Sequence, residues 1–98
     1  MAEIVWSEPA SNSLDAIADY IAFDNPLAAK RLVQKITRSV EYPARFPKLG
    51  PHIPEAPKES ARQLVIRPCR VFYRIRGEKV IIVNIVRNEM QFQRHFLS

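Results

Sequence analysis

Arginine is concentrated in the last part of the chain, and it is the residue type here that is best suited to chemistry. Residues 62–98 hold eight Lys or Arg against two Asp or Glu, and seven of the eight are arginine. Residues 1–61 are nearly balanced, with seven Lys or Arg against eight acids. Guanidinium groups bind phosphate or carboxylate in a planar, two-point geometry. The excess favours contact with nucleic acid, a nucleic-acid enzyme or an acidic protein; the alternative is a solvated basic sheet edge that discourages strand pairing.

Metal, cofactor and thiol chemistry are not indicated by the sequence. The one cysteine, Cys69, has no partner at Cys-x-x-Cys spacing, so we expect a core or bend residue. His52 has no second histidine or cysteine at metal-binding spacing. The only glycines are Gly50 and Gly77, which excludes a glycine-rich phosphate loop. We therefore expect no metal and no cofactor.

Length and composition favour one small soluble domain over residues 1–98. The chain has 98 residues and is 47% hydrophobic, enough for one modest core. No apolar run is long enough to span a membrane, and the first residues lack the pattern of a secretory signal. A single cysteine fits a reducing compartment. We expect a cytoplasmic protein.

The first half of the chain predicts a strand followed by two helices. Residues 3–7 alternate as a strand, and Ser7 is a candidate helix cap before Glu8 and Pro9. Asn25 and Pro26 end this helix and start the next. Apolar stripes at helical spacing are formed by Leu14, Ile17, Ala18 and Ile21, and then by Ala29, Leu32, Val33, Ile36 and Val40; Lys30, Arg31, Gln34, Lys35 and Arg38 cover the other side of the second helix. So short a turn predicts an antiparallel helix hairpin, with Pro43 ending or kinking the second helix.

The second half predicts a loop followed by three strands. Residues 46–60 contain four prolines and one glycine, which prevents both a helix and a central strand. Strands follow at 62–67, 70–76 and 79–87, and Gly77-Glu78 suits a two-residue type II′ hairpin turn.

The hairpin register decides which side chains share a face. Pairing Arg76 with Lys79 places Arg70, Phe72, Arg74 and Arg76 with Ile81, Val83, Ile85 and Arg87, and it places Val71, Tyr73 and Ile75 with Val80, Ile82, Asn84 and Val86. The second face is more apolar and should meet the helices. A one-residue slip would exchange the faces on one strand. The mixed arginine and apolar face is suited to binding something long, amphipathic and acidic.

Several motifs in this order resemble a known family. They are Asp19-Tyr20-Ile21-Ala22 leading into Asp24-Asn25-Pro26, Ala28-Ala29-Lys30-Arg31-Leu32, Phe46-Pro47-Lys48-Leu49-Gly50, Arg62-Gln63-Leu64-Val65 and Arg70-Val71-Phe72-Tyr73-Arg74-Ile75. Together they resemble the RelE/ParE superfamily of toxins from bacterial type II toxin–antitoxin modules, over essentially the whole chain. The helix hairpin and the tail Val83-Asn84-Ile85-Val86-Arg87, ending in Gln91-Phe92, are most similar to the ParE branch. The resemblance implies an α+β fold, with an N-terminal strand and an antiparallel helix hairpin packed on a small antiparallel sheet in the order β-α-α-β-β-β.

The resemblance implies one of two activities. ParE-like toxins inhibit DNA gyrase, whereas RelE-like toxins cut mRNA on the ribosome. For the ribonuclease the residues that match the family are Arg62 and Arg70, and a ribonuclease would also use Arg87 and His95. The family's second arginine falls near Met90 and its tyrosine near Arg94, so the acid and base needed for RNA cleavage are incomplete. This favours a ParE-like gyrase inhibitor without catalysis of its own.

The resemblance also implies partners. A cognate acidic, amphipathic antitoxin would neutralise the toxin, and DNA would be contacted only indirectly, through that antitoxin. We expect partner binding by Arg70, Phe72, Arg74, Arg76, Arg87, Met90 and Phe92. The alternatives are a RelE-like ribonuclease that uses ribosome and mRNA, or a degenerate toxin that only binds its antitoxin.

Overall fold

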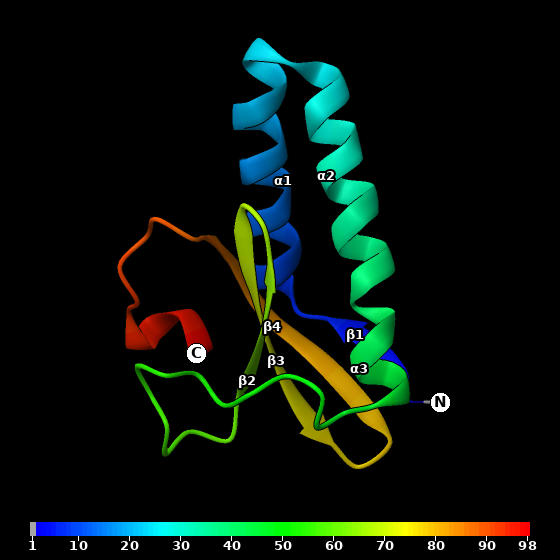
Figure 1. Ribbon diagram of the computed structural model, residues 1–98, viewed down its shortest axis with the longest axis vertical. Coiled ribbons are helices and arrows are strands. Elements are labelled where there is room, and N and C mark those ends of the chain that lie inside the picture. The colour runs from blue at the N-terminus through cyan, green and yellow to red at the C-terminus, as the bar shows by residue number, and fades with distance from the viewer. Residues whose placement is uncertain (1) are drawn as a thin grey trace.

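Short polar signals in the sequence set where the helices begin. The hydroxyl oxygen of Ser7 accepts a hydrogen bond from the N–H of Ala10 at 3.2 Å, and Pro9 lies in the first turn, where its missing N–H has no cost. The side-chain oxygen of Asn25 accepts from the N–H of Ala28 at 3.0 Å. Both predicted caps are confirmed, and the two helices form the predicted antiparallel hairpin (Figure 1).

The structure is a computed structural model that describes residues 2–98. Its elements, in chain order, are β1 (Glu3–Trp6), α1 (Glu8–Asp24), α2 (Pro26–Ser39), the short α3 (Glu41–Arg45), β2 (Arg62–Ile66), β3 (Cys69–Arg76), β4 (Lys79–Arg87) and a 3₁₀ turn, η1 (Arg94–Leu97). Pro43 lies inside α3, after the second helix has already ended. Among these residues, no helix is both long enough and apolar enough to pass through a lipid bilayer.

The four strands form one sheet with the order β1-β4-β3-β2. β2, β3 and β4 pair antiparallel, as predicted. β1 pairs parallel with β4, with Ile4 opposite Val80, so the sheet is mixed and the expectation of a wholly antiparallel sheet was wrong. The long connection through the helices permits this arrangement, because parallel neighbours need a crossover and not a tight turn. The α+β class is confirmed.

The β3–β4 hairpin follows the predicted register only near its turn. Gly77 has φ 57°, as the first central residue of a type II′ turn requires, and within residues 2–98 no non-glycine residue has positive φ. Arg76 pairs with Lys79. The register then shifts by one residue, so that Phe72 pairs with Asn84. This β-bulge adds one residue to β4 and reverses the alternation beyond it. The predicted faces of Asn84, Ile85, Val86 and Arg87 were therefore wrong.

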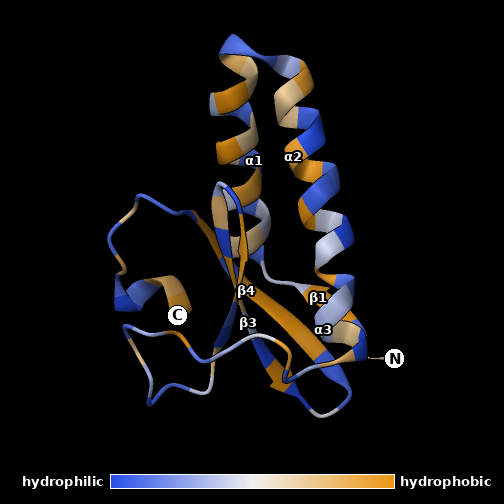
Figure 2. Cartoon of the chain, in the orientation of Figure 1, coloured by the Kyte–Doolittle hydropathy of each residue, from blue (hydrophilic) through white to orange (hydrophobic). Residues whose placement is uncertain are grey.

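The sheet has a hydrophobic cluster on each side. The helix-side cluster contains Leu14, Leu32, Ile36, Val71, Tyr73, Ile82 and Ile85, among others. It agrees with the apolar stripes that run along α1 and α2 and with the largely hydrophobic β4 (Figure 2). The second cluster contains Ile53, Ala56, Ala61, Phe72, Val83, Val86, Phe96 and Leu97.

Two segments cover the face of the sheet away from the helices. They are the proline loop, residues 46–61, and the C-terminal segment, residues 88–98. Figure 1 shows both on that side, in green and in red. The face that we expected to be open is therefore largely an internal packing surface.

Candidate functional site

Arg70 is a buried side chain at the centre of a polar network, and not an exposed docking residue. Its two terminal nitrogens lie 2.9 and 2.7 Å from the two carboxylate oxygens of Glu55, and Nε and Nη2 donate to Oε1 of Gln63 at 3.0 and 2.7 Å. The guanidinium also lies 5.1 Å from the ring centre of Phe72. The hydrogen bond from Arg70 holds the pKa of Glu55 below its ordinary value, outweighing the opposite effect of burial. Arg70 is thus committed to holding the proline loop on the sheet.

The next two arginines on this face become progressively more accessible. Arg74 is half-buried and donates to Oγ of Ser60 at 2.8 Å and to the carbonyl of Leu97 at 3.4 Å. Glu59 lies 3.8 Å from it. Arg76, beside the hairpin turn, is exposed. Since Arg70 and Phe72 are buried, the expectation that this whole face is open for docking was wrong.

The remaining predicted partner residues lie around the end of β4. Arg87 stacks over the ring of Tyr20 in α1, with 4.8 Å from its central carbon to the ring centre, and it pairs with Glu89 at 3.2 Å. Met90 is 45% exposed. Phe92 packs edge-on against Phe72, with 5.8 Å between ring centres. Phe92 is therefore part of the second cluster's cover, while Arg87 and Met90 are accessible.

An apolar groove runs between α1, the end of β4 and the C-terminal segment. It has a volume of about 250 Å³, and its lining includes Ile17, Met90, Arg87 and Ser13. Asn84 joins its walls, because its amide oxygen accepts from Oγ of Ser13 at 2.7 Å and its nitrogen donates to the Phe96 carbonyl at 3.1 Å. Asn84 lies at the bulge, an irregularity that sequence reasoning missed.

The four candidate ribonuclease residues are not brought together. Arg62 pairs with Tyr73 and Arg87 pairs with Cys69, and both partners belong to the helix-side cluster. Arg70 is an odd number of residues from each partner on β3, so it projects from the opposite face. Tyr73 and Cys69 are four residues apart, which is about 13 Å along a strand.

Arg62 and His95 have local contacts of their own. Arg62 donates to the carbonyl oxygen of Gly50 at 2.8 Å. His95 is exposed in η1 and its ring lies 4.8 Å from that of Phe96. Among the hydrogen bonds, ion pairs and ring contacts of residues 2–98, neither Arg62 nor His95 contacts another of the four candidates.

Two further ionisable groups are enclosed. Cys69 is fully buried, and burial raises the pKa of its thiol, which disfavours the thiolate. The Tyr73 hydroxyl accepts from the N–H of Gly50 at 2.9 Å and donates to the Pro47 carbonyl at 2.7 Å, and burial raises its pKa. Within residues 2–98, no group of three His, Cys, Asp or Glu side chains could hold a metal ion.

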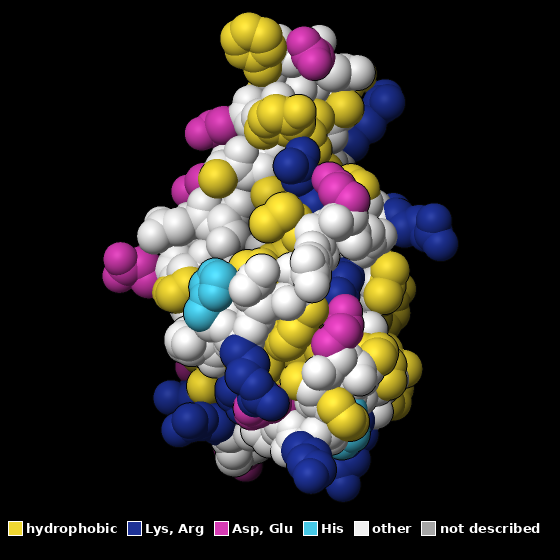
Figure 3. Space-filling view, turned by 90° about the vertical axis from the view of Figure 1, so that its left-hand side faces the viewer, with side chains coloured by type: hydrophobic (Ala, Val, Ile, Leu, Met, Phe, Trp, Pro, Cys, Tyr) yellow, Lys and Arg dark blue, Asp and Glu magenta, His cyan; other side chains and the backbone are white. Residues whose placement is uncertain are grey.

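The free end of the helix hairpin exposes large apolar side chains that sequence reasoning did not single out. Phe23 is 91% exposed, Tyr20 69% and Leu27 54%. Hydrophobic atoms gather at this end in the space-filling view (Figure 3). Helical spacing could have indicated this exposure, because Tyr20 and Phe23 lie outside the apolar stripe that runs from Leu14 to Ile21.

Comparison with known proteins gives consistent matches. The family described as "ParE toxin of type II toxin-antitoxin system, parDE" matches residues 4–92. "Toxin RelE2" of Caulobacter vibrioides is 34% identical over 86 residues, covering 87% of this chain and 93% of that protein. The solved structure "Chromosomal ParDE TA system from P. aeruginosa" superposes with a TM-score of 0.74 at 27% identity, covering 91% of this chain and 98% of that one.

Proposed function

Because the chain belongs to the ParE toxin family of type II toxin–antitoxin systems, we propose that it inhibits DNA gyrase by binding it, without catalysing a reaction of its own. The observation that carries this proposal is the separation of Arg62, Arg70 and Arg87 over two faces of the sheet. Metal-independent RNA cleavage needs an acid, a base and cations around one phosphate. The guanidinium of Arg70 is paired with the carboxylate of Glu55 within the protein, so it is not free to bind a phosphate. A toxin that acts by binding its target alone does not need these groups around one point.

The proposal is tested by adding the purified chain to DNA gyrase and relaxed plasmid. Supercoiling should fall as the toxin concentration rises, because the bound toxin blocks a step of the gyrase cycle. The measurement is the fraction of supercoiled plasmid on an agarose gel. Unchanged supercoiling at a large toxin excess would contradict the proposal.

Two parallel measurements separate the alternatives. Primer extension on mRNA from induced cells should show intact transcripts; cuts at codon-defined positions would indicate a RelE-like ribonuclease instead. Induction without an antitoxin should stop growth, whereas normal growth would indicate a degenerate toxin that only binds its antitoxin.

We further propose that an acidic, amphipathic antitoxin segment neutralises the toxin in the cytoplasm by binding the groove between α1, β4 and the C-terminal segment. Type II toxins pair with a cognate antitoxin. The groove offers apolar surface at Ile17 and Met90, with the guanidinium of Arg87 at its side. An amphipathic helix places apolar side chains in such a groove and acids at its rim. Arg76, exposed at the hairpin turn, lies outside this groove.

Met90→Glu should weaken antitoxin binding about tenfold or more, because a carboxylate would be buried against apolar groups. The measurement is isothermal titration with the cognate antitoxin, which we expect to be encoded by a small acidic reading frame beside this gene. Met90→Leu keeps an apolar side chain of similar volume and should bind normally. Equal affinities for both variants would place the antitoxin elsewhere.

A further inference from the structure

The two helices of the hairpin carry opposite charge. α1 contains Glu8, Asp15, Asp19 and Asp24 and no Lys or Arg, whereas α2 contains Lys30, Arg31, Lys35 and Arg38 and no Asp or Glu. The ion pairs within residues 2–98 use Glu55, Glu59 and Glu89, with arginines outside α2. The cations of α2 are therefore unpaired within the described part of the chain.

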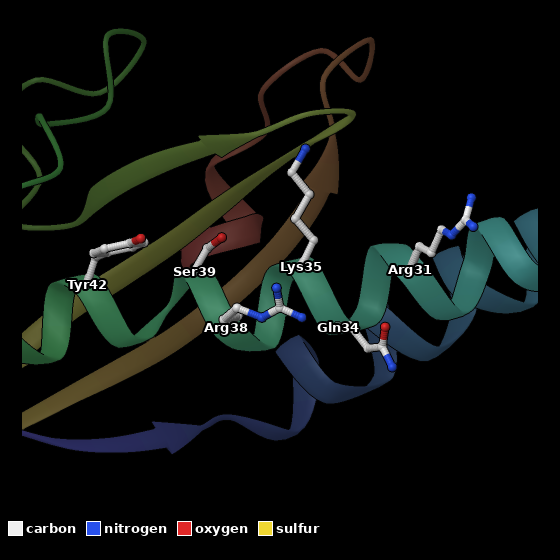
Figure 4. Close-up of a pocket in the computed structure, with 6 residues that line it drawn as sticks. All are labelled: Arg31, Gln34, Lys35, Arg38, Ser39 and Tyr42. Atoms are coloured by element: carbon white, nitrogen blue, oxygen red, sulfur yellow. The ribbon is translucent and has the colours of Figure 1, made fainter.

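A shallow groove of about 330 Å³ lies along these cations. Its lining consists of Arg31, Gln34, Lys35, Arg38, Ser39 and Tyr42. Figure 4 shows Arg31, Lys35, Ser39 and Tyr42 projecting from one side of the helical segment, with Gln34 and Arg38 flanking them. The ammonium group of Lys35 donates to the Arg67 carbonyl at 3.3 Å, which gives it one anchor at the β2–β3 turn.

The chemistry of this lining suits phosphate. Every lining side chain can donate a hydrogen bond, and none is a carboxylate. Arg31 and Arg38 are seven residues apart, about 10 Å along a helix. One strand of duplex DNA carries about three phosphates over that axial length.

The lining also argues against an amphipathic peptide as occupant. Such a peptide needs apolar pockets for its anchoring side chains. The α2 groove contributes polar and cationic groups, unlike the groove at Ile17 and Met90. Phosphate contacts by Arg, Lys, hydroxyl and amide groups position a protein on DNA without reading its sequence.

We infer that the groove on α2 binds the phosphate backbone of duplex DNA without sequence preference. This contact is direct, whereas the family resemblance implies DNA contact only through an antitoxin. It goes beyond the gyrase proposal and does not depend on it. This binding would concentrate the protein on DNA, where DNA-processing enzymes act.

The test is fluorescence anisotropy with a labelled duplex of about two helical turns and the purified full-length chain, without antitoxin. Three phosphate contacts predict a slope of about −2.7 in log affinity against log salt, or a roughly 40-fold loss between about 50 and 200 mM salt. A second duplex of unrelated sequence should bind equally. No binding at the lower salt concentration, or a marked preference for one duplex, would overturn the inference.

Matched variants locate the site. Arg31→Gln, Lys35→Gln and Arg38→Gln together should abolish most of the salt dependence. Lys48→Gln, Lys58→Gln and Lys79→Gln together change the net charge equally at exposed positions elsewhere and should retain it. Lys35→Gln alone should make the slope less negative by about 0.9. This single variant tests the site even if the triple variant folds poorly. Equal losses in the two triple variants, or equal competition by polyglutamate of matched charge, would argue against a phosphate site here.

Discussion

Replacing Gly50 with alanine is expected to destabilise the fold by about 3 kcal/mol, the upper part of the usual range for overpacking a tight site. A Cβ atom at this position would lie 2.3 Å from the carbonyl oxygen of Gln63 and 2.8 Å from the hydroxyl of Tyr73. The carbonyl belongs to β2, and the tyrosine side chain is fully buried. Neither can move aside without opening the helix-side cluster.

The change would also disturb the hydrogen bonds that attach the proline loop. Gly50 donates to the Tyr73 hydroxyl, which in turn donates to Pro47. Urea unfolding at neutral pH, followed by circular dichroism, measures the loss.

Gly77→Ala is the matched control. Gly77 has open space around its Cβ position but a φ of 57°, so alanine there should cost about 1 kcal/mol through backbone strain alone. If Gly50→Ala cost no more than this control, the tight contact with β2 would be contradicted.

Arg70→Met is expected to cost about 2–3 kcal/mol, less than the full value for breaking a buried ion pair because Glu55 remains partly exposed. The variant keeps an apolar side chain next to Phe72 but removes both donors to the buried Gln63 side chain and both to Glu55. Unsatisfied buried acceptors account for much of the loss. The same unfolding measurement applies, with the exposed Arg76→Met as the control, which should be nearly neutral.

The contribution of this ion pair should depend on pH in a defined direction. Because Arg70 lowers the pKa of Glu55 in the folded protein, stabilisation by the pair is complete above the ordinary glutamate pKa of 4.5. It is lost as pH falls through the lower folded pKa. The stability difference between the native chain and Glu55→Gln should therefore be present at neutral pH and shrink below about pH 4.5. A difference that stays constant down to acidic pH would show that the charge of Glu55 contributes nothing.

Local signals explain what the sequence predicts well. The caps at Ser7 and Asn25 and the turn at Gly77 each depend on a side chain or φ angle within a few residues. Helix and strand positions follow from short-range periodicity, and the α+β class follows from their order. The parallel pairing of β1 depends on contacts across the whole chain, for which no local pattern exists.

Nonlocal contacts explain where the predicted site was wrong. The arginine face was predicted from alternation, but the partner of Arg70 is Glu55, in a loop whose prolines indicate only that it is neither helix nor strand. Nothing in the spacing places that loop over the sheet. The cations of α2 were visible as a helical face, whereas their lack of acidic partners became apparent only once the ion pairs were known. The two proposed sites, the groove at Met90 and the groove on α2, therefore lie on surfaces that sequence periodicity alone did not identify as binding sites.

The extra residue in β4 has a practical consequence for any systematic mutagenesis of this strand. In an unbroken strand, residues four apart share an orientation and tolerate polar replacements alike. Ile81, before the irregularity, is half-buried, whereas Ile85, after it, is 1% exposed. The alternation between positions that tolerate polar residues and positions that do not should therefore reverse at Val83 and Asn84. Substitutions before and after this point in β4 should be chosen from separate patterns of burial.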